Sequence, residues 1–563
     1  MSSDNFSTCV QMSSSPSNSS DNKTFIVDPS VNLSGSTTYK TRVTTGIKDT
    51  AGNALSSQYD TSTGFTTEGW MQEAYIKASN NDANDMFSIK VSLDGDTLAV
   101  GAYEEDSNQS TITNDNSTAS SNDSSSDSGA VYVYKRTGTT WAQEAYIKAS
   151  NNDAEDFFGL SVSLDGDTLA VGAYKEDSNQ TTITNDNSTA SSNDSNSDSG
   201  AVYVYKRTGT TWAQEAYIKA SNNDANDYFG HNVALDGDTL AVGAYKEDSN
   251  QSTITNDNST ASSNDDNNSS GAVYVYKRTG TTWAQEAYVK ASNSDAGDNF
   301  GYRVALDGDT LAVGAYKEDS NQSTITNDNS TASSNDDNNR SGAVYVYKRT
   351  VTTWEQEAYV KASNNDSRDN FGRSVSLDGD TLAVGAWYED SNQTTITNDN
   401  STASSNDSNS DSGAVYVYKR TGTTWAQEAY IKASNNDESD MFGINVALES
   451  DTLAVGAYRE DSNQTTITND NFTASSNDGT AESGAVYVYK RTGTTWAQEA
   501  YVKASNNDEY DYFGHNVTLD NGTLAVGAHS EDSDQTTITN DNSTASSNDS
   551  NSDSGAVYVY SLK

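Results

Sequence analysis

Paired aspartates recur at a fixed spacing along most of this chain, and such pairs can bind a hard cation. The first member of each pair precedes a strand-like run that begins with Phe, and the second opens a polar tract after the run TLAVGA. Because adjacent strands of a sheet run antiparallel here, both members are expected to leave the sheet at the same end. Carboxylate oxygens with Asn and Ser oxygens beside them suit Ca²⁺. We therefore expect one Ca²⁺ to be shared by each of these pairs: Asp85 and Asp106, Asp156 and Asp177, Asp227 and Asp248, Asp298 and Asp319, Asp369 and Asp390, Asp440 and Asp461, Asp511 and Asp532.

A second interpretation of the same loops needs no metal. Asn and Asp readily form Asx turns, and an acidic loop in water is an ordinary solvated surface. The polar tract Glu104–Ser128 carries a lone Ile112, whose repetition in every unit predicts a small docking contact. The sequence leaves the cation site and the solvated loop open as alternatives.

Side chains that commonly act as catalysts are few and scattered. The three histidines, His231, His515 and His529, occur in two of seven repeated units and lack the spacing of zinc motifs, so we interpret them as surface or turn residues. The sequence contains no G-x-S-x-G nucleophile motif. Catalysis needs one asymmetric group of residues, and units this similar are not expected to provide one. The sequence therefore predicts that the protein is not an enzyme.

The composition narrows the possible partners. Asp and Glu total 81 against 33 Lys and Arg, which gives a formal net charge of −48. Such a surface repels nucleic acid and anionic lipid, so neither is an expected partner. No apolar run is long enough to insert into a membrane, and a single cysteine, Cys9, rules out an intrachain disulfide.

One repeated unit of 71 residues accounts for almost everything after residue 69. Without its polar tract, each unit has about the length of a four-stranded propeller blade, roughly 40–45 residues. Seven such units fit the roughly four to eight blades that close a ring. The sequence therefore predicts an all-β fold, a seven-bladed β-propeller over residues 70–563, with units that begin at Trp70, Trp141, Trp212, Trp283, Trp354, Trp425 and Trp496.

Four strands are expected in each unit. The hydrophobic pattern places the first set at Phe87–Leu93, Thr97–Ala102 and Gly129–Tyr134, followed by Trp141–Lys148 at the start of the next 71-residue step. The last of these is amphipathic and is expected to be half exposed. Asp-Gly between the first two strands, as at Asp165-Gly166, predicts a type I′ turn with positive φ at both residues.

The ends of the repeat array predict how the ring closes. The array begins with an outer strand, Trp70–Ser79, and ends with a third strand, Gly555–Tyr560. If these two segments pair, every blade has four strands and no edge is left open. We therefore expect a ring closed within one chain, and a monomer.

The units resemble FG-GAP repeats, the blades of the integrin α-chain propeller and of many bacterial surface proteins. Phe-Gly pairs carry the resemblance, together with the runs TLAVGA and GAVYVY that follow them; the first unit departs, with Phe87-Ser88. The family often binds Ca²⁺ in a longer loop between the first two strands. Here that loop, Leu93–Thr97, has too few oxygens and is interpreted as a turn. The Phe-Gly pairs begin at Phe158, Phe229, Phe300, Phe371, Phe442 and Phe513.

Residues 1–69 resemble the C-terminal part of bacterial Ig-like domains of surface-layer type. The pattern includes Tyr39, Val43, Gly46–Asp49, Gly52-Asn53 and Phe65. An Ig-like β-sandwich needs about 100 residues, so we expect a partial domain and a piece of a longer secreted protein. The alternative is a leader that carries only a few β-prone residues.

Together these features predict an extracellular or cell-surface propeller that acts in adhesion, through a protein or glycan ligand bound on its acidic, loop-rich face. Binding in that case would depend on Ca²⁺. A structural spacer without a specific ligand is the alternative, and a carbohydrate-active enzyme on a propeller scaffold is the third hypothesis. Adhesion is implied by the resemblance alone, since a fold does not establish a function.

Overall fold

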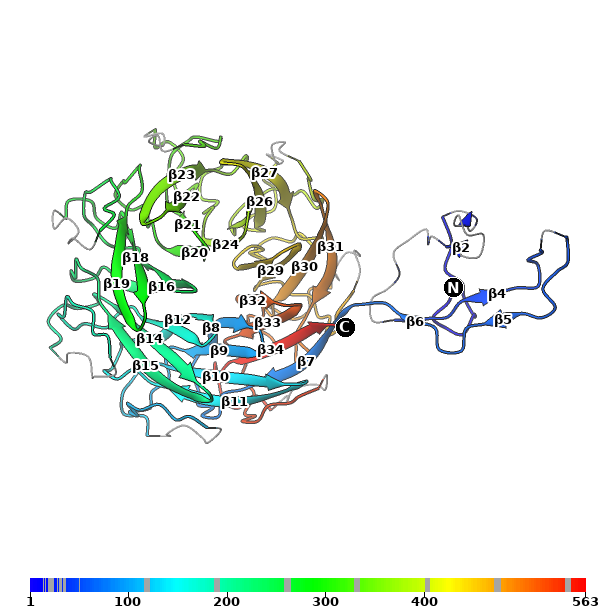
Figure 1. The fold of residues 1–563 in the computed structure, drawn as a ribbon, viewed down its shortest axis with the longest axis horizontal. Coiled ribbons are helices and arrows are strands. Elements are labelled where there is room, and N and C mark those ends of the chain that lie inside the picture. Colours follow the sequence, from blue (N-terminus) through cyan, green and yellow to red (C-terminus); the bar gives the residue numbers. More distant parts are fainter. Residues whose placement is uncertain are drawn as a thin grey trace.

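The computed structural model of the chain is a ring of seven β-sheets with a smaller β-rich segment beside it (Figure 1). No helix occurs in the part of the chain that the structure describes. The described residues are 1–13, 15, 17–18, 25–27, 29, 33, 37–49, 51–115, 122–186, 193–257, 265–328, 335–399, 406–469, 477–541 and 548–563.

Each blade is an antiparallel sheet whose four strands run in order from the central channel outward, which confirms the predicted propeller. The blades are numbered from the first lining strand. Blades 1 to 4 contain β8 (Phe87–Asp94), β9 (Thr97–Ala102), β10 (Ala130–Thr137) and β11 (Thr140–Ile147); β12 (Phe158–Asp165), β13 (Thr168–Ala173), β14 (Ala201–Thr208) and β15 (Thr211–Ile218); β16 (Phe229–Asp236), β17 (Thr239–Ala244), β18 (Ala272–Thr279) and β19 (Thr282–Val289); β20 (Arg303–Asp307), β21 (Thr310–Ala315), β22 (Ala343–Thr350) and β23 (Thr353–Val360). Blades 5 to 7 contain β24 (Ser374–Asp378), β25 (Thr381–Ala386), β26 (Ala414–Thr421) and β27 (Thr424–Ile431); β28 (Val446–Glu449), β29 (Thr452–Ala457), β30 (Ala485–Thr492) and β31 (Thr495–Val502); β32 (Asn516–Asp520), β33 (Thr523–Ala528), β34 (Ala556–Leu562) and β7 (Trp70–Ile76).

The hydrophobic core lies between neighbouring blades. One cluster joins Val131 and Ile147 of blade 1 to Phe158, Tyr203 and Trp212 of blade 2, and all five side chains are buried. The central strands are covered on both faces, as a continuous apolar run such as TLAVGA requires.

Two glycines bring adjacent blades into backbone contact. A Cβ added to Gly101 of blade 1 would lie 1.9 Å from the carbonyl oxygen of Gly159 in blade 2. Gly159 itself has φ 98°, a conformation that glycine adopts readily. The Gly of TLAVGA and the Gly that follows Phe are therefore required by the same contact, which recurs around the ring.

The ring closes by β-pairing of its two ends, as the sequence predicts. Strand β7 pairs antiparallel with β34, from Trp70 opposite Leu562 to Ile76 opposite Val557. Gly69 and Lys563 add two backbone hydrogen bonds of 2.8 and 3.0 Å at the same seam.

The turn between the first two strands differs from the prediction. Asp165 is the last residue of β12 and pairs with Thr168, so the turn consists of Gly166 and Asp167. Of these two, Gly166 alone has positive φ, 57°, so the predicted type I′ turn at Asp165-Gly166 is wrong and the φ pattern is that of type II′. In blade 7, Asn521 and Gly522 have φ 48° and 68°, the pattern of type I′.

The outer strand is not half exposed, and that prediction is wrong for a definite reason. Tyr146 is fully buried because the polar insert covers it: Thr113 and Tyr146 exchange two backbone hydrogen bonds of 2.9 Å. Asn114 then reaches blade 2, where its side chain donates to the carbonyl of Trp212 and accepts from the backbone N–H of the same residue. Ile112 packs against the core cluster of blades 1 and 2, which confirms the predicted docking contact.

The described residues of the N-terminal segment form three short strand pairs. These are β1 (Ser17–Asn18) with β2 (Phe25–Ile26), β3 (Thr38–Tyr39) with β6 (Phe65–Thr66), and β4 (Arg42–Val43) with β5 (Tyr59–Asp60).

Ring closure predicts unequal effects for two nested truncations. Removing residues 1–79 should lower the free energy of unfolding by at least about 5 kcal/mol relative to removing residues 1–60. The larger truncation takes Trp70, Tyr75 and Ile76 out of the core, at about 2–5 kcal/mol each. Urea melts of both variants measure the difference, and equal midpoints would contradict a closed ring.

A strained turn predicts a stabilising substitution. Val351 has φ 64° and is 89% exposed, at a turn position where five other blade connections have Gly. Because an L-residue with a branched side chain is disfavoured there, Val351→Gly should stabilise the protein by about 1 kcal/mol. The reverse change at the equivalent position, Gly138→Val, should destabilise it by a similar amount in the same urea melts. A loss of stability in Val351→Gly would show that the turn is not strained.

Candidate functional site

The predicted aspartates lie on one face of the ring, but their environments differ. The first member of each pair is buried and the second is half buried. Burial, followed by the charges of Glu105, Asp82 and Asp106, raises the pKa of Asp85 to about 9. Asp106 is part of the insert, where its Oδ1 accepts the backbone N–H of Asp127 at 2.7 Å. The two carboxylates are thus neighbours, and whether they share a cation stays a prediction.

Unpartnered oxygens point to a slightly different group of residues around Asp85. Ser79 Oγ, Asn81 Oδ1, Asp82 Oδ2 and Asp85 Oδ2 are all buried and have no hydrogen-bond partner. The same four atoms are without partners in blades 2, 3, 5 and 7 at the equivalent positions. Buried polar atoms are normally paired, so four orphaned oxygens in one loop fit a cation that would take up their lone pairs. Within the described residues no three His, Cys, Asp or Glu side chains form a metal cluster, so such a site would combine two carboxylates with neutral oxygens.

Other carboxylates on this face have a structural partner. Glu105 and Lys148 form a fully buried ion pair of 2.7 Å, and Lys148 also donates to Ser128 Oγ at 2.8 Å. Burial lowers the pKa of Lys148, which the charge of Glu105 opposes. The pair recurs in all seven blades and fixes the insert to the outer strand. These glutamates therefore have a structural role and are not free to bind a cation.

A ring of side chains that the sequence analysis missed surrounds the channel mouth on the same face. Each blade contributes the residue before the lining Phe, the second residue after it, and the residue that follows TLAVGA. We call these 21 residues the crown. Its members are Met86, Ile89 and Tyr103; Phe157, Leu160 and Tyr174; Tyr228, His231 and Tyr245; Asn299, Tyr302 and Tyr316; Asn370, Arg373 and Trp387; Met441, Ile444 and Tyr458; Tyr512, His515 and His529.

The crown contains a continuous arc of aromatic contacts across blades 1 to 4. Ring centroids are 5.4 Å apart between Tyr103 and Phe157, and 5.2 Å apart between Tyr174 and Tyr228. The arc continues from Tyr245 to Tyr302, at 5.2 Å. Further contacts of 5.7, 5.6 and 4.5 Å, within blades 2, 3 and 4, join these pairs into one series.

Cations lie over several of these rings. Lys246 Nζ is 3.9 Å from the ring centroid of Tyr228, and Lys175 Nζ is 4.3 Å from that of Phe157. The guanidinium of Arg373 lies 4.4 Å from the centroid of Tyr302. The crown is therefore aromatic and cationic, in contrast to the acidic loops around it.

All three histidines belong to the crown; the interpretation as turn residues holds for His529, which lies in a turn, but it missed that all three gather at the channel mouth. His231 and His515 are half buried at the channel mouth, because they follow Phe-Gly at the start of a lining strand. Burial lowers the pKa of His231 and His515 well below the usual value, and that of His529 to about 4. His515 and His529 have ring centroids 4.5 Å apart. The crown also differs from blade to blade, so the seven units are less alike than the repeat suggests.

A signal for the crown was present in the sequence. Comparison of the seven units with one another shows constant residues in the strands and varied ones at three positions beside the lining Phe and TLAVGA. The signal was missed because the units were treated as identical.

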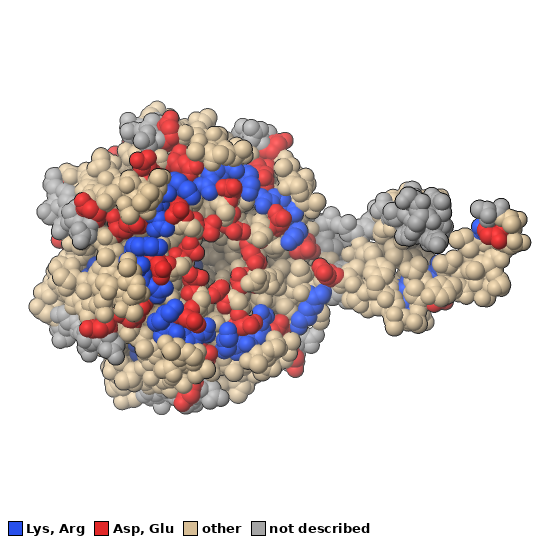
Figure 2. Space-filling model, viewed as in Figure 1, with Lys and Arg blue, Asp and Glu red and all other residues tan. Residues whose placement is uncertain are grey.

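The opposite face carries a regular pattern of charge. Arg136 Nε donates to Asp96 at 2.7 Å in the turns of blade 1, and the equivalent pair recurs in the next five blades. Figure 2 shows a face on which basic side chains form a belt around the central opening with acidic side chains inside it, the arrangement that such pairs produce. This face repeats with the blades, and the crown does not.

A model of the FG-GAP repeat matches seven segments of the chain, which together cover most of its length: 70–134, 141–205, 212–256, 283–327, 354–418, 425–489 and 496–560. The chain belongs to the FG-GAP repeat family. Residues 2–67 match a bacterial Ig-like domain, which confirms the second resemblance. Both domain types are typical of extracellular or surface proteins.

Other comparisons add little to this FG-GAP assignment. No protein of curated function matches the chain. A solved structure, the phage phi92 endosialidase, matches 91% of this chain and 71% of its own, with 12% sequence identity and a TM-score of 0.33. A superposition this loose carries no functional argument. Among the described residues no helix is long and apolar enough to span a membrane.

Proposed function

We propose that this FG-GAP protein is a non-catalytic, cell-surface or extracellular binding module, and that the crown holds its protein or glycan ligand. The observation that carries the proposal is the position of the differences among the seven blades. Residues with a structural task, such as Gly159, Glu105 and Lys148, are repeated in nearly every blade. Four crown residues are buried: Asn299, Asn370, Met441 and Ile444. The others vary in size, charge and hydrogen-bonding capacity, as a surface that recognises one asymmetric ligand would.

The chemistry of the crown favours binding over catalysis. None of its 21 members is Asp or Glu, whereas most glycoside hydrolases act through two carboxylates. Tyr and Trp provide large, rigid contact surfaces with a polar edge, which is why they dominate binding sites. A spacer with no ligand would not require Arg373 and Trp387 where the other blades have different residues.

Two crown tyrosines provide the test of this proposal. Tyr174→Ala with Tyr245→Ala should lower binding to glycan-array or cell-surface ligands by at least about tenfold, because each removes a ring from the aromatic arc. Val351→Gly, on the opposite face, is the control and should bind as the unaltered protein does. Unchanged binding by the tyrosine variant would contradict the crown as the site, and an absence of any ligand would favour the spacer. Turnover of a polysaccharide panel would favour the enzyme.

We also propose that Ca²⁺ binds the seven loops that contain Asp85 and its equivalents. The support is the set of orphaned oxygens on Ser79, Asn81, Asp82 and Asp85, together with the raised pKa of Asp85. A bound cation would replace the missing partners and offset the repulsion between carboxylates.

Calcium addition should therefore raise the melting temperature more than salt does. At a hundredfold excess over the dissociation constant, each site would contribute about 2.7 kcal/mol. The measurement compares melting in 1 mM CaCl₂ with NaCl of matched ionic strength, and coincident curves would remove the metal from the proposal. Titration calorimetry then separates two geometries: Asp82→Asn should reduce the number of bound ions by one, and Asp106→Asn should reduce it only if the originally predicted pair holds the ion.

A further inference from the structure

The central channel is lined by the seven innermost strands, which present their free edges to it. The cavity that they enclose has a volume of about 390 Å³. Edge strands leave backbone N–H groups unpaired, and these need other acceptors. In four blades, the backbone N–H of a Val in the lining strand donates to a side chain from the lining strand of the blade before it. Asn232 accepts from Val304 at 2.8 Å and Ser161 accepts from Val233 at 2.9 Å.

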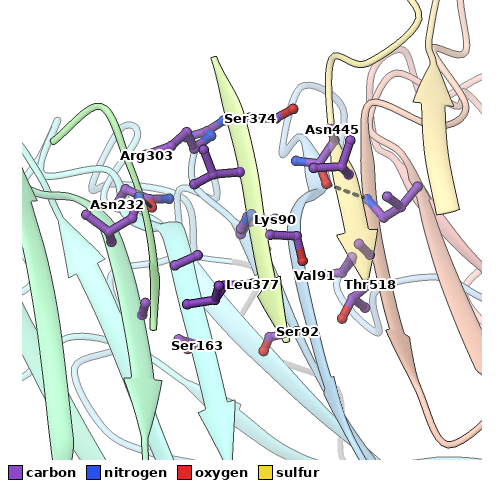
Figure 3. A pocket seen from close by; sticks show the side chains of 18 of the residues that line it. Lys90, Val91, Ser92, Ser163, Asn232, Arg303, Ser374, Leu377, Asn445 and Thr518 are labelled. Carbon is purple, nitrogen blue, oxygen red and sulfur yellow. Dashed lines mark hydrogen bonds between the residues drawn. The ribbon is translucent and has the colours of Figure 1, made fainter. Parts of the chain in front are cut away.

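Asn445 and Asn516 form the same cap, to Val517 and Val91, whereas Ser374 of blade 5 donates to the carbonyl of Gly443 at 2.8 Å, so Ser or Asn has a structural role at this position in five blades. Blades 1 and 4 depart from this rule, with Lys90 and Arg303. A lysine or arginine side chain has no acceptor, so neither can cap the next strand. Figure 3 shows both at the same end of the channel as Asn232 and Asn445, with Ser92 and Ser163 further along it.

A third cation joins these two at the mouth. Arg373 of blade 5 lies over the same ring as its neighbour Arg303: their guanidinium carbons are 4.4 and 5.2 Å from the centroid of Tyr302. Burial, and then the charges of Arg303 and Arg373, lower the pKa of Lys90 to about 7. Three cations from three blades therefore influence one another at one end of the channel.

These cations are uncompensated, although the protein is strongly acidic. None of the three forms an ion pair with any residue in the described part of the chain, whereas Arg136 of the turns and Lys148 of the insert are each paired at 2.7 Å. Arg303 Nε and Arg373 Nη1 are buried donors without a hydrogen-bond partner. The three side chains are half buried, and charges withdrawn from water are ordinarily paired, so these groups are suited to an anion.

We propose that the channel mouth, through Lys90, Arg303 and Arg373, binds the carboxylate or sulfate group of an acidic glycan whose sugar rings lie on the crown. The proposal rests on the crown being the ligand site and specifies the chemistry of the ligand. Guanidinium groups bind oxyanions with paired hydrogen bonds, and Arg303 and Arg373 have donors free for them.

A glycan fits the crown better than a peptide does. The described part of the crown presents ring faces and side-chain donors, whereas peptide recognition by strand addition uses a free sheet edge, and the free edges of the lining strands lie inside the channel and not at the crown. Sugar rings can cover the aromatic arc with their apolar faces while their hydroxyls face solvent. The acidic loops outside the crown repel polyanions in general, so binding would require an anionic group that reaches the mouth.

Carboxylates at the other end of the channel restrict the direction from which an anion can enter. Each lining strand ends in a carboxylate that accepts a backbone N–H from the next blade's turn, as Asp94 does from Gly166 at 2.6 Å. Burial and the neighbouring Asp520 and Asp165 raise the pKa of Asp94. An anion is therefore attracted from the crown end only.

The repeat itself supplies the variant that tests the proposal. Lys90→Ser with Arg303→Asn places the residues of other blades at both positions, which restores the acceptors for the next strands. The full chain is assayed by biolayer interferometry against polygalacturonate, dextran sulfate, neutral dextran and polyglutamate. The matched control is Arg340→Gln with Arg368→Gln, which removes two exposed cations of blades 4 and 5 from the same face.

The cap-restoring variant should keep or exceed the original melting temperature and lose at least tenfold in affinity for polygalacturonate, dextran sulfate or both. The control should retain its affinity, and neutral dextran should not distinguish the variants. The two polyanions separate carboxylate from sulfate as the bound group. Unchanged affinity of the variant would overturn the proposal, and an equal loss toward polyglutamate would overturn its assignment to a glycan. Crown-dependent binding of neutral glycans alone would overturn this inference while leaving the proposed function intact.

Discussion

Backbone contact between glycines of adjacent blades is the constraint on which the rest of this structure depends. At Gly101 and Gly159 no β-carbon fits, so the second strand of one blade and the lining strand of the next approach as closely as two backbones can. That approach sets the spacing of the blades and therefore the width of the channel. It also fixes Phe158 and Gly159 in place, and their successors then project into the mouth. At the seam between blades 7 and 1, Ser88 stands at the position equivalent to Gly159. Its φ is 81°, so the backbone has the same positive φ there without a glycine.

The polar groups of each blade are of two kinds: some pair with each other inside the blade, and others lie in loops and turns that face water. Glu105 and Lys148 satisfy each other inside the blade, and Asn114 holds the insert to the next blade. The net charge of −48 is consequently carried mostly by loops and turns in water, where it costs little stability. Against this background the unpartnered oxygens near Asp85 and the unpaired Arg303 are exceptions, and they have opposite sign. One region is suited to a cation and the other to an anion.

The sequence predicted the ring well because its evidence was long-range and redundant. Seven equal units and complementary ends required β7 to pair with β34, whatever the details of a single strand. Predictions that depended on local register were less reliable: the turn at Gly166 begins one residue later than the Asp-Gly pattern suggested. Tyr146 was expected at the surface because nothing in the outer strand reveals that Thr113 covers it. His231 was misinterpreted because its position in the unit was not compared with the equivalent residues of the other blades.

That last error identifies what a repeat sequence can show about function. A residue type that recurs at one position in most blades satisfies a requirement of the ring, as Asn232 and Asn445 do when they cap the next lining strand. A residue that departs from this pattern gives up that contribution, so folding alone does not account for it. Lys90 and Arg303 leave a neighbouring strand without its cap and place charge in a confined channel, so both choices oppose stability. The anionic group of the proposed ligand would supply, in the bound state, the partner that the free ring lacks.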